Sequence, residues 1–158
     1  MGKAEKPAGL PAPGEGKRGE GGHLGYLLRQ AAHACRIRME QALADLDLTP
    51  PQFSVLTMLD AYSGGSNADL ARLALLTPQT MSVIVANLIK AGLVERRPHA
   101  VHGRIQQIEL TSAGRTALAA AKARVCALEA DLAQGLTGKA EAAVRGWLAG
   151  LATGLAEG

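Results

Sequence analysis

The sequence predicts a mainly α-helical protein with a small β-sheet of two or three strands. Three observations lead to this fold class. Apolar residues recur at three- and four-residue spacing over most of the chain, which is the periodicity of helices. Gly, Pro, Ser and Thr separate these segments at positions where helices start and stop. Residues 93–110 alternate instead with a period close to two, as strands do.

The composition fits a globular chain. It has 158 residues, of which 47% are hydrophobic and 20% are charged, and this length is sufficient to bury a core. No apolar run approaches the roughly 20 residues that span a bilayer, and no segment has the pattern of a signal peptide. Cys35 and Cys126 lie far apart in predicted helices, which favours reduced thiols. We therefore expect a cytoplasmic protein.

The first half of the chain predicts a leader and two helices. Residues 1–22 are rich in Gly, Pro, Lys and Glu without periodicity, which indicates a disordered leader. Its four cations face three anions, so a net charge of +1 does not favour a DNA-binding arm. A long helix is expected over residues 23–46, and Thr49 and Pro50 begin the next one. That second helix is expected to bury Phe53, Leu56, Leu59 and Tyr62.

Residues 66–90 predict two short helices joined by a tight break. Ser66 is a favourable N-cap, and Asp69 at the third helical position completes a capping box. Thr77 repeats the N-cap signal, Pro78 fits the first helical position, and Gly92 is expected to end the second helix. The second helix has an apolar side and a polar side. Its polar side carries Gln79, Thr80, Ser82, Val83, Asn87 and Lys90.

Two strands are expected at residues 93–97 and 104–110, joined by a turn at 98–103. Two helices followed by such a hairpin form a winged helix-turn-helix, whose second helix fits the DNA major groove. A generic helical core with a hairpin is the alternative. The agreement of caps, turn residues and hairpin favours the DNA-binding interpretation. Residues 66–104 carry five cations and two anions, and this net charge of +3 equals that of the whole chain.

The chain resembles the MarR family of bacterial transcription regulators. The resemblance rests on LGYLLRQAAH from residue 24, LTPPQFSVL from 48, ADLARLALLTPQTMS from 68, LIKAGLVERR from 88 and LTSAGR from 110. It extends from about residue 24 to the C-terminus. The family's wing carries an acidic residue followed by two arginines, whereas this chain has His102, Gly103 and Arg104 there. Only Arg104 therefore matches, and the resemblance implies that it enters the minor groove.

The DNA-binding interpretation assigns roles to individual side chains. Gln79, Thr80 and Ser82, near the start of the second helix, are expected to read base edges together with Asn87. Thr77 and Lys90 are expected to hold phosphates. Arg97 and Arg104 complete the expected DNA-binding set. The implied activity is repression of transcription until a small ligand binds.

The terminal helices are expected to form a homodimer. Long helices near both ends, one of them at about residues 113–132, are too apolar to be exposed to solvent on their own. The resemblance implies that they form the dimer interface. Gly146, Gly150 and Gly154 predict the close approach of another backbone, and a poorly ordered C-terminal end is the alternative. We therefore expect dimerisation regions at 23–48 and 112–158 around a DNA-binding domain at 49–111. A two-fold dimer predicts a pseudo-palindromic DNA site.

Two sensor sites are considered on the first helices. Arg29 and His33 lie four residues apart on one helix face beside apolar residues, and the resemblance implies that Arg29 holds an aromatic carboxylate, with Phe53 as a pocket wall. In the alternative, Arg29 pairs with an acidic residue across the dimer and His33 packs. Cys35 offers a second alternative, a thiol-based redox switch, but its place on the apolar stripe favours a buried inert thiol.

No enzyme motif is present, so we expect no catalytic residues and no cofactor. His99 and His102 could offer two nitrogens to zinc, but a zinc site needs three or four ligands, so no metal site is expected. Aromatic residues make up only 3% of the chain, which disfavours stacking on single-stranded nucleic acid.

Overall fold

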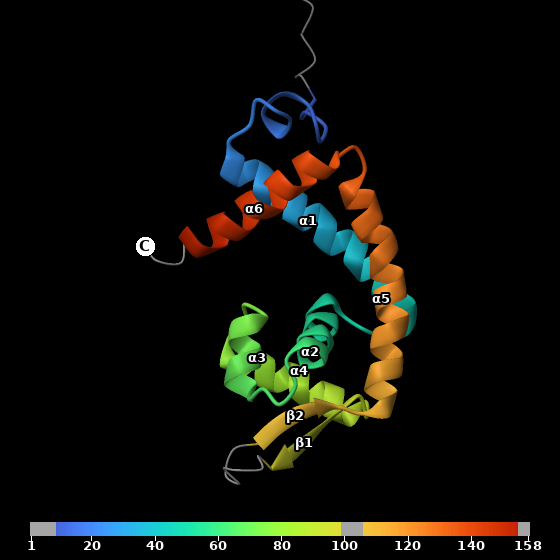
Figure 1. Ribbon diagram of the computed structural model, residues 1–158. Coiled ribbons are helices and arrows are strands. Elements are labelled where there is room, and N and C mark those ends of the chain that lie inside the picture. The colour runs from blue at the N-terminus through green and yellow to red at the C-terminus, as the bar shows by residue number, and fades with distance from the viewer. Residues whose placement is uncertain (1–8, 99–105, 155–158) are drawn as a thin grey trace, which may run out of the picture. The chain divides into compact units, whose positions relative to one another are not determined.

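The computed structural model describes residues 9–98 and 106–154 (Figure 1). The chain forms two compact units, Met1–Met39 and Glu40–Gly158. In the first unit a short 3-10 helix, η1 (Gly16–Arg18), precedes the long helix α1 (Leu24–Leu43), which ends in the second unit.

The described part of the leader has structure that its composition did not predict. Arg18 Nε donates to Gln30 Oε1 at 3.2 Å, and Gln30 Nε2 donates back to the Arg18 carbonyl at 3.0 Å. This reciprocal pair fixes η1 against α1. One polar side chain on α1, Gln30, thus bonds to both the side chain and the backbone of Arg18, while the disordered leader stays a prediction.

The second unit contains the remaining elements. In chain order they are η2 (Ala44–Leu46), α2 (Pro50–Ala61), α3 (Asn67–Leu73), α4 (Pro78–Lys90), β1 (Val94–Pro98), β2 (Gln106–Leu110), α5 (Ser112–Ala133) and α6 (Gly138–Gly154). The strands are antiparallel, with Val94 opposite Leu110 and Pro98 opposite Gln106. This order confirms the predicted fold class, with two strands in the described sheet.

The helix boundaries follow the predicted capping signals. The Ser66 and Asp69 capping box starts α3, and Thr77 caps α4 with Pro78 in its first turn. Thr49 caps α2 in the same way, with Gln52 as the reciprocal partner. Gly92 follows α4 with a φ of +73°, the left-handed conformation that ends helices.

The core of the second unit lies where α2, α3, α4, the strands and α5 meet. Its largest fully buried side chains are Leu43, Val55, Leu56, Leu70, Met81, Val85, Leu88, Val94 and Ile108. Tyr62, predicted to be buried, is exposed instead. It lies just beyond the end of α2, where the structure provides fewer neighbours than helical periodicity alone suggests.

The corner between α3 and α4 is made without glycine. Leu75 takes the left-handed conformation at φ +55° with 92% of its surface exposed, and the Leu76 N–H donates to the Ala71 carbonyl at 2.9 Å. This arrangement closes α3 as a helix C-cap. Among the described residues no single helix meets the length and hydropathy expected of a membrane span; α3 and α4, bent by 109°, meet it only when counted as one.

Candidate nucleic-acid interface

One side of α4 is buried and the other faces outward. Met81, Val85 and Leu88 have no exposed surface, and they hold α4 against the core. The opposite side carries the residues that the sequence placed there. Gln79, Thr80, Ser82, Val83, Asn87 and Lys90 are all exposed. This side offers amide, hydroxyl and ammonium groups to a partner.

The start of α4 is fixed by its own side chains. Thr77 Oγ1 accepts a hydrogen bond from the Thr80 N–H at 3.1 Å, and the two hydroxyls lie 3.0 Å apart. Ser82 Oγ donates to the Pro78 carbonyl at 2.9 Å. The first turn is thus held in one conformation, while the side chain of Gln79 projects from it into solvent.

Asp69 is held ionised at the start of α3. The Ser66 hydroxyl and backbone N–H donate to Asp69 Oδ2 at 2.6 and 3.0 Å, and Arg72 pairs with the other oxygen. The Ser66 hydroxyl, the Ser66 N–H and Arg72, in that order of effect, lower the pKa of the Asp69 carboxyl below its ordinary value. The cap therefore stays charged at neutral pH, and its negative charge interacts favourably with the positive, N-terminal end of the helix dipole.

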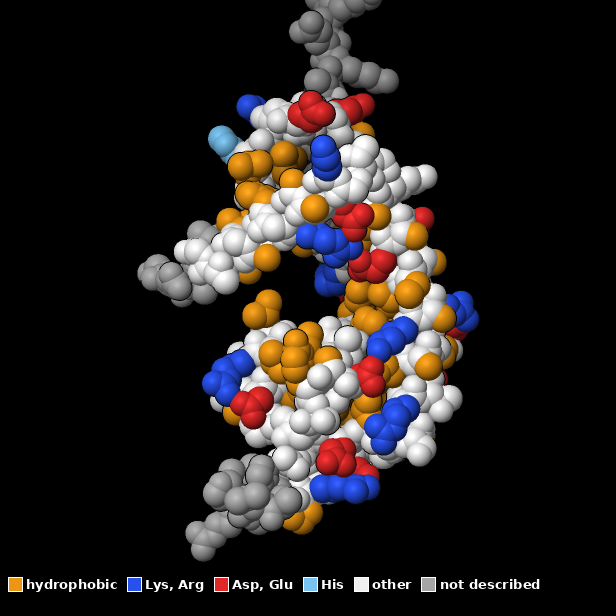
Figure 2. Space-filling model, viewed as in Figure 1, with side chains coloured by type: hydrophobic (Ala, Val, Ile, Leu, Met, Phe, Trp, Pro, Cys, Tyr) orange, Lys and Arg blue, Asp and Glu red, His pale blue; other side chains and the backbone are white. Residues whose placement is uncertain are grey.

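Arg97 on β1 lies between two carboxylates. Its Nη2 is 2.7 Å from Glu95 Oε1 and its Nε is 3.4 Å from Glu109 Oε2. Basic and acidic side chains accordingly lie next to each other over the strands (Figure 2). The predicted DNA contact Arg97 is thus partly neutralised by its own sheet. Arg104, His99 and His102 lie outside the described residues.

The predicted ligand-binding residues are distributed over both units. In the first unit Arg29 is exposed, with its guanidinium carbon 5.8 Å from the centre of the Tyr26 ring, and His33 Nδ1 lies 3.3 Å from Arg36 Nη2. Phe53 is half-buried in α2 of the second unit. Cys35 is a free thiol and is half-buried. Its side chain is therefore more exposed than the predicted buried thiol.

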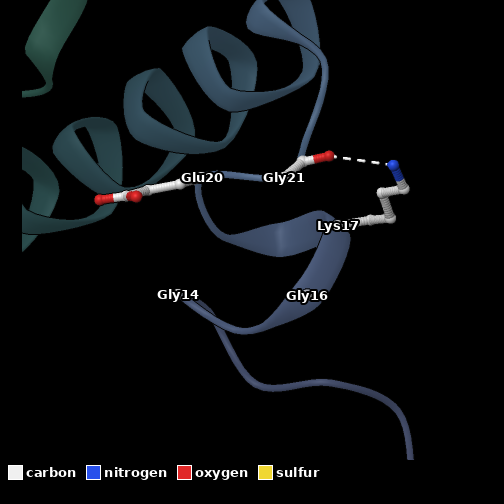
Figure 3. A pocket seen from close by; sticks show the side chains of 5 residues that line it. All are labelled: Gly14, Gly16, Lys17, Glu20 and Gly21. Atoms are coloured by element: carbon white, nitrogen blue, oxygen red, sulfur yellow. Dashed lines mark hydrogen bonds between the residues drawn. The ribbon is translucent and has the colours of Figure 1, made fainter.

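The hollow in the leader does not have the chemistry of an effector site. It measures about 590 Å³ and is lined by Gly14, Gly16, Gly21, Lys17 and Glu20. Figure 3 shows Lys17 and Glu20 pointing in different directions, with Lys17 Nζ donating to the Gly21 carbonyl at 3.1 Å. In the part of the chain that the structure describes, no three His, Cys, Asp or Glu side chains gather as metal ligands.

Comparison with known proteins identifies the family. Residues 46–105 match the model of the MarR family. The HTH-type transcriptional repressor Rv2887 of Mycobacterium tuberculosis is 40% identical over 114 residues, which cover 72% of this chain and 82% of the relative. The chain belongs to the MarR family. It is a DNA-binding transcription repressor of the MarR type and not an enzyme, as the sequence predicted.

Solved MarR-type structures share the fold. CouR bound to a 23-mer DNA duplex is 30% identical, with a TM-score of 0.76 over 82% of this chain and 92% of that one. Rv2887 in complex with salicylic acid is 36% identical, with a TM-score of 0.66 over 82% and 96%. CouR from Rhodococcus jostii RHA1 bound to p-coumaroyl-CoA is 26% identical, with a TM-score of 0.77 over 82% and 91%.

Proposed function

We propose that this MarR family repressor binds a two-fold symmetric DNA operator as a homodimer and releases it when a small aromatic acid binds. The outward side of α4 carries the proposal. It presents short polar side chains on a helix whose first turn is fixed by Thr77 and Pro78 and whose other side is fully buried. A rigid helix with this distribution fits the major groove of duplex DNA. Such a regulator acts in the cytoplasm.

Each residue of the DNA-binding set receives a role in this proposal. Gln79, Thr80 and Asn87 read base edges, because amides and hydroxyls match the donors and acceptors of the major groove. The DNA phosphates are held by Thr77, Lys90 and Arg97, and the minor groove is entered by Arg104. Ser82, predicted to read bases, instead positions the start of α4, since its hydroxyl already donates to the Pro78 carbonyl.

The terminal helices support a dimer. In α6 none of the 17 residues is buried, and Val144, Trp147 and Leu148 expose 40–47% of their surfaces. In α1 only Leu43 is buried. Apolar faces of this length favour burial against a second copy, in an interface of roughly 2,000–5,000 Å². Two α4 helices related by such a dimer would contact half-sites about one DNA turn apart.

The effector proposal rests on Arg29 and on what two relatives bind. Rv2887 has been solved with salicylic acid and CouR with p-coumaroyl-CoA, and both ligands carry an aromatic ring. In this chain Arg29 is an exposed cation beside the Tyr26 ring, which suits a ligand with a carboxylate. We assign the carboxylate to Arg29 with His33 nearby on the same helix. Phe53 stays a prediction, to be tested by its own substitution.

The DNA-binding proposal is tested with duplexes that the protein selects from a random library. We expect a dimer on each selected duplex and a recognisable inverted repeat. Gln79→Ala should cost about 1–3 kcal/mol at particular base pairs only. Lys90→Ala should weaken binding to every sequence and lower the salt slope by about one. A monomer at micromolar concentration, or no enriched duplex at low salt, would reject the proposal.

The effector proposal is tested by adding salicylate to the protein–DNA complex. We expect the wild-type protein to release DNA, and Arg29→Ala to bind DNA normally without responding. Arg38→Ala, on the same helix, is the matched control and should respond as the wild type does. Normal release by Arg29→Ala would place the ligand elsewhere.

The alternative, a thiol switch, is tested with peroxide. Release of DNA by peroxide that is lost in Cys35→Ser would favour the thiol switch.

A further inference from the structure

The centre of the exposed side of α4 contains an apolar residue. Successive residues of an α-helix are rotated by ~100°, so positions 79, 83, 86 and 90 form one line along α4. This line is opposite the buried line of Met81, Val85 and Leu88. Val83 lies in it between Gln79 and Lys90, with 61% of its surface exposed. It therefore occupies the part of α4 that would enter deepest into a groove.

The residues that the structure describes leave Val83 mostly uncovered. Of the large apolar residues of α4, three are fully buried, Ile84 is half-buried and Ile89 is 36% exposed, so Val83 is the most exposed. Helix stability does not favour it either, because a β-branched residue is a weaker helix former than Gln or Lys. At the centre of a helix that enters the major groove, an apolar side chain surrounded by polar ones is placed to contact an apolar group of the bound DNA.

Only one base offers such a partner in the major groove. Thymine carries a 5-methyl group there, while the other base edges present donors and acceptors. We propose that Val83 recognises the methyl group of a thymine in each operator half-site. Ala86, exposed one turn later on the same line, leaves the space that lets the helix approach this methyl closely. The inference rests on the proposed DNA-binding function and adds a residue that determines base specificity.

The experiment removes the methyl group from the DNA and its partner from the protein. In a duplex selected by the wild-type protein, each symmetric pair of thymines is replaced in turn by uracil, and affinity is measured by fluorescence anisotropy. At one pair we expect uracil to weaken wild-type binding about 15-fold, or about fourfold per half-site, from one methyl-sized group removed from contact. Val83→Ala should bind the thymine and uracil duplexes equally.

The control keeps a methyl group at the same position. Val83→Thr is nearly isosteric and should retain sensitivity to uracil at the same thymine pair. Since residue 83 is exposed, Val83→Thr should unfold near the wild-type urea midpoint, and Val83→Ala at or slightly above it because alanine is the better helix former. The proposal is overturned if every uracil duplex weakens wild type and Val83→Ala by the same factor, or if no uracil substitution has an effect. In both cases the operator is still bound, whereas failure of the proposed function leaves no selected duplex at all.

Discussion

Asn67, the first residue of α3, donates a hydrogen bond from Nδ2 to Ser82 Oγ in α4 at 3.2 Å. The same amide lies 3.3 Å from the Pro78 carbonyl, to which the Ser82 hydroxyl also donates. One side chain thus connects the two helices of the helix-turn-helix at the position where α4 begins. The angle of α4 relative to α3 is fixed by this small network, and Ser82 serves it as both donor and acceptor.

We expect Asn67→Ala and Ser82→Ala to lose the same interaction. Each should lower the free energy of unfolding by about 0.5–1.5 kcal/mol, and the double variant should lose less than the sum of the two. Urea unfolding of the four proteins measures the coupling. Operator affinity should fall by one common factor over a panel of base-pair variants. A loss confined to particular base pairs in Ser82→Ala would return Ser82 to base reading.

Gly114 allows α5 to begin against the segment that joins α4 to β1. A Cβ at this position would lie 1.9 Å from the Leu93 carbonyl oxygen, which accepts the Thr111 N–H at 3.1 Å. Since backbone atoms on both sides must move, Gly114→Ala should destabilise the fold by at least about 1–3 kcal/mol, which thermal or urea unfolding measures. Gly138→Ala is the control, because a Cβ there meets nothing within 4 Å. Equal stability of the two variants would contradict this packing.

The helix-turn-helix could be predicted because its boundaries depend on local chemistry. Ser66 with Asp69, Thr77 with Pro78, and Gly92 each act within a few residues of themselves, and the structure places the helix ends where they predict. Longer-range relationships were not predictable in this way. Nothing in the sequence pairs Asn67 with Ser82 or Arg97 with Glu109, since these contacts depend on how elements pack.

The same distinction explains the exceptions. Leu75 occupies a left-handed position where a sequence pattern would call for glycine, because the corner is imposed by the packing of the two helices. The described leader residues gain structure through Gln30, a residue far away in sequence. Periodicity and capping signals describe local structure only. They therefore do not predict contacts that a residue makes with another element or another molecule.

Glu95 restrains Arg97. It accepts from Arg97 Nη2 and Nε at 2.7 and 3.0 Å, so under the proposed role of Arg97 a DNA phosphate would compete with it for this guanidinium. We expect Glu95→Gln to raise operator affinity several-fold and to steepen its dependence on salt, because one more cation reaches phosphate. Anisotropy titrations at several salt concentrations measure both. An equal gain in Glu129→Gln, on α5 and outside the sheet, would show a general charge effect instead.

The Asp69 cap predicts a pH dependence of stability. Its carboxyl pKa is lowered in the folded protein by the two Ser66 donors and by Arg72. A group of this kind contributes stability above its ordinary pKa of 3.8, and the contribution is lost as the pH falls through the lower folded value. We expect the difference in unfolding free energy between wild type and Asp69→Asn to shrink in strong acid. A difference that stays constant with pH would contradict this role.

The glycine line of α6 tests whether two copies meet along this helix. Among the described residues a Cβ on Gly146 or Gly150 would meet nothing within 4 Å, so these positions leave room for another backbone. If a second copy approaches this line, Gly150→Ala should weaken the dimer, and its dissociation constant measured by sedimentation should rise at least tenfold. Gly138→Ala, at the start of α6, should leave the dimer unchanged. The opposite result is equally clear: an unchanged dimer with unfolding free energy raised by about 1 kcal/mol would show that the line faces solvent, because alanine then contributes only its higher helix propensity.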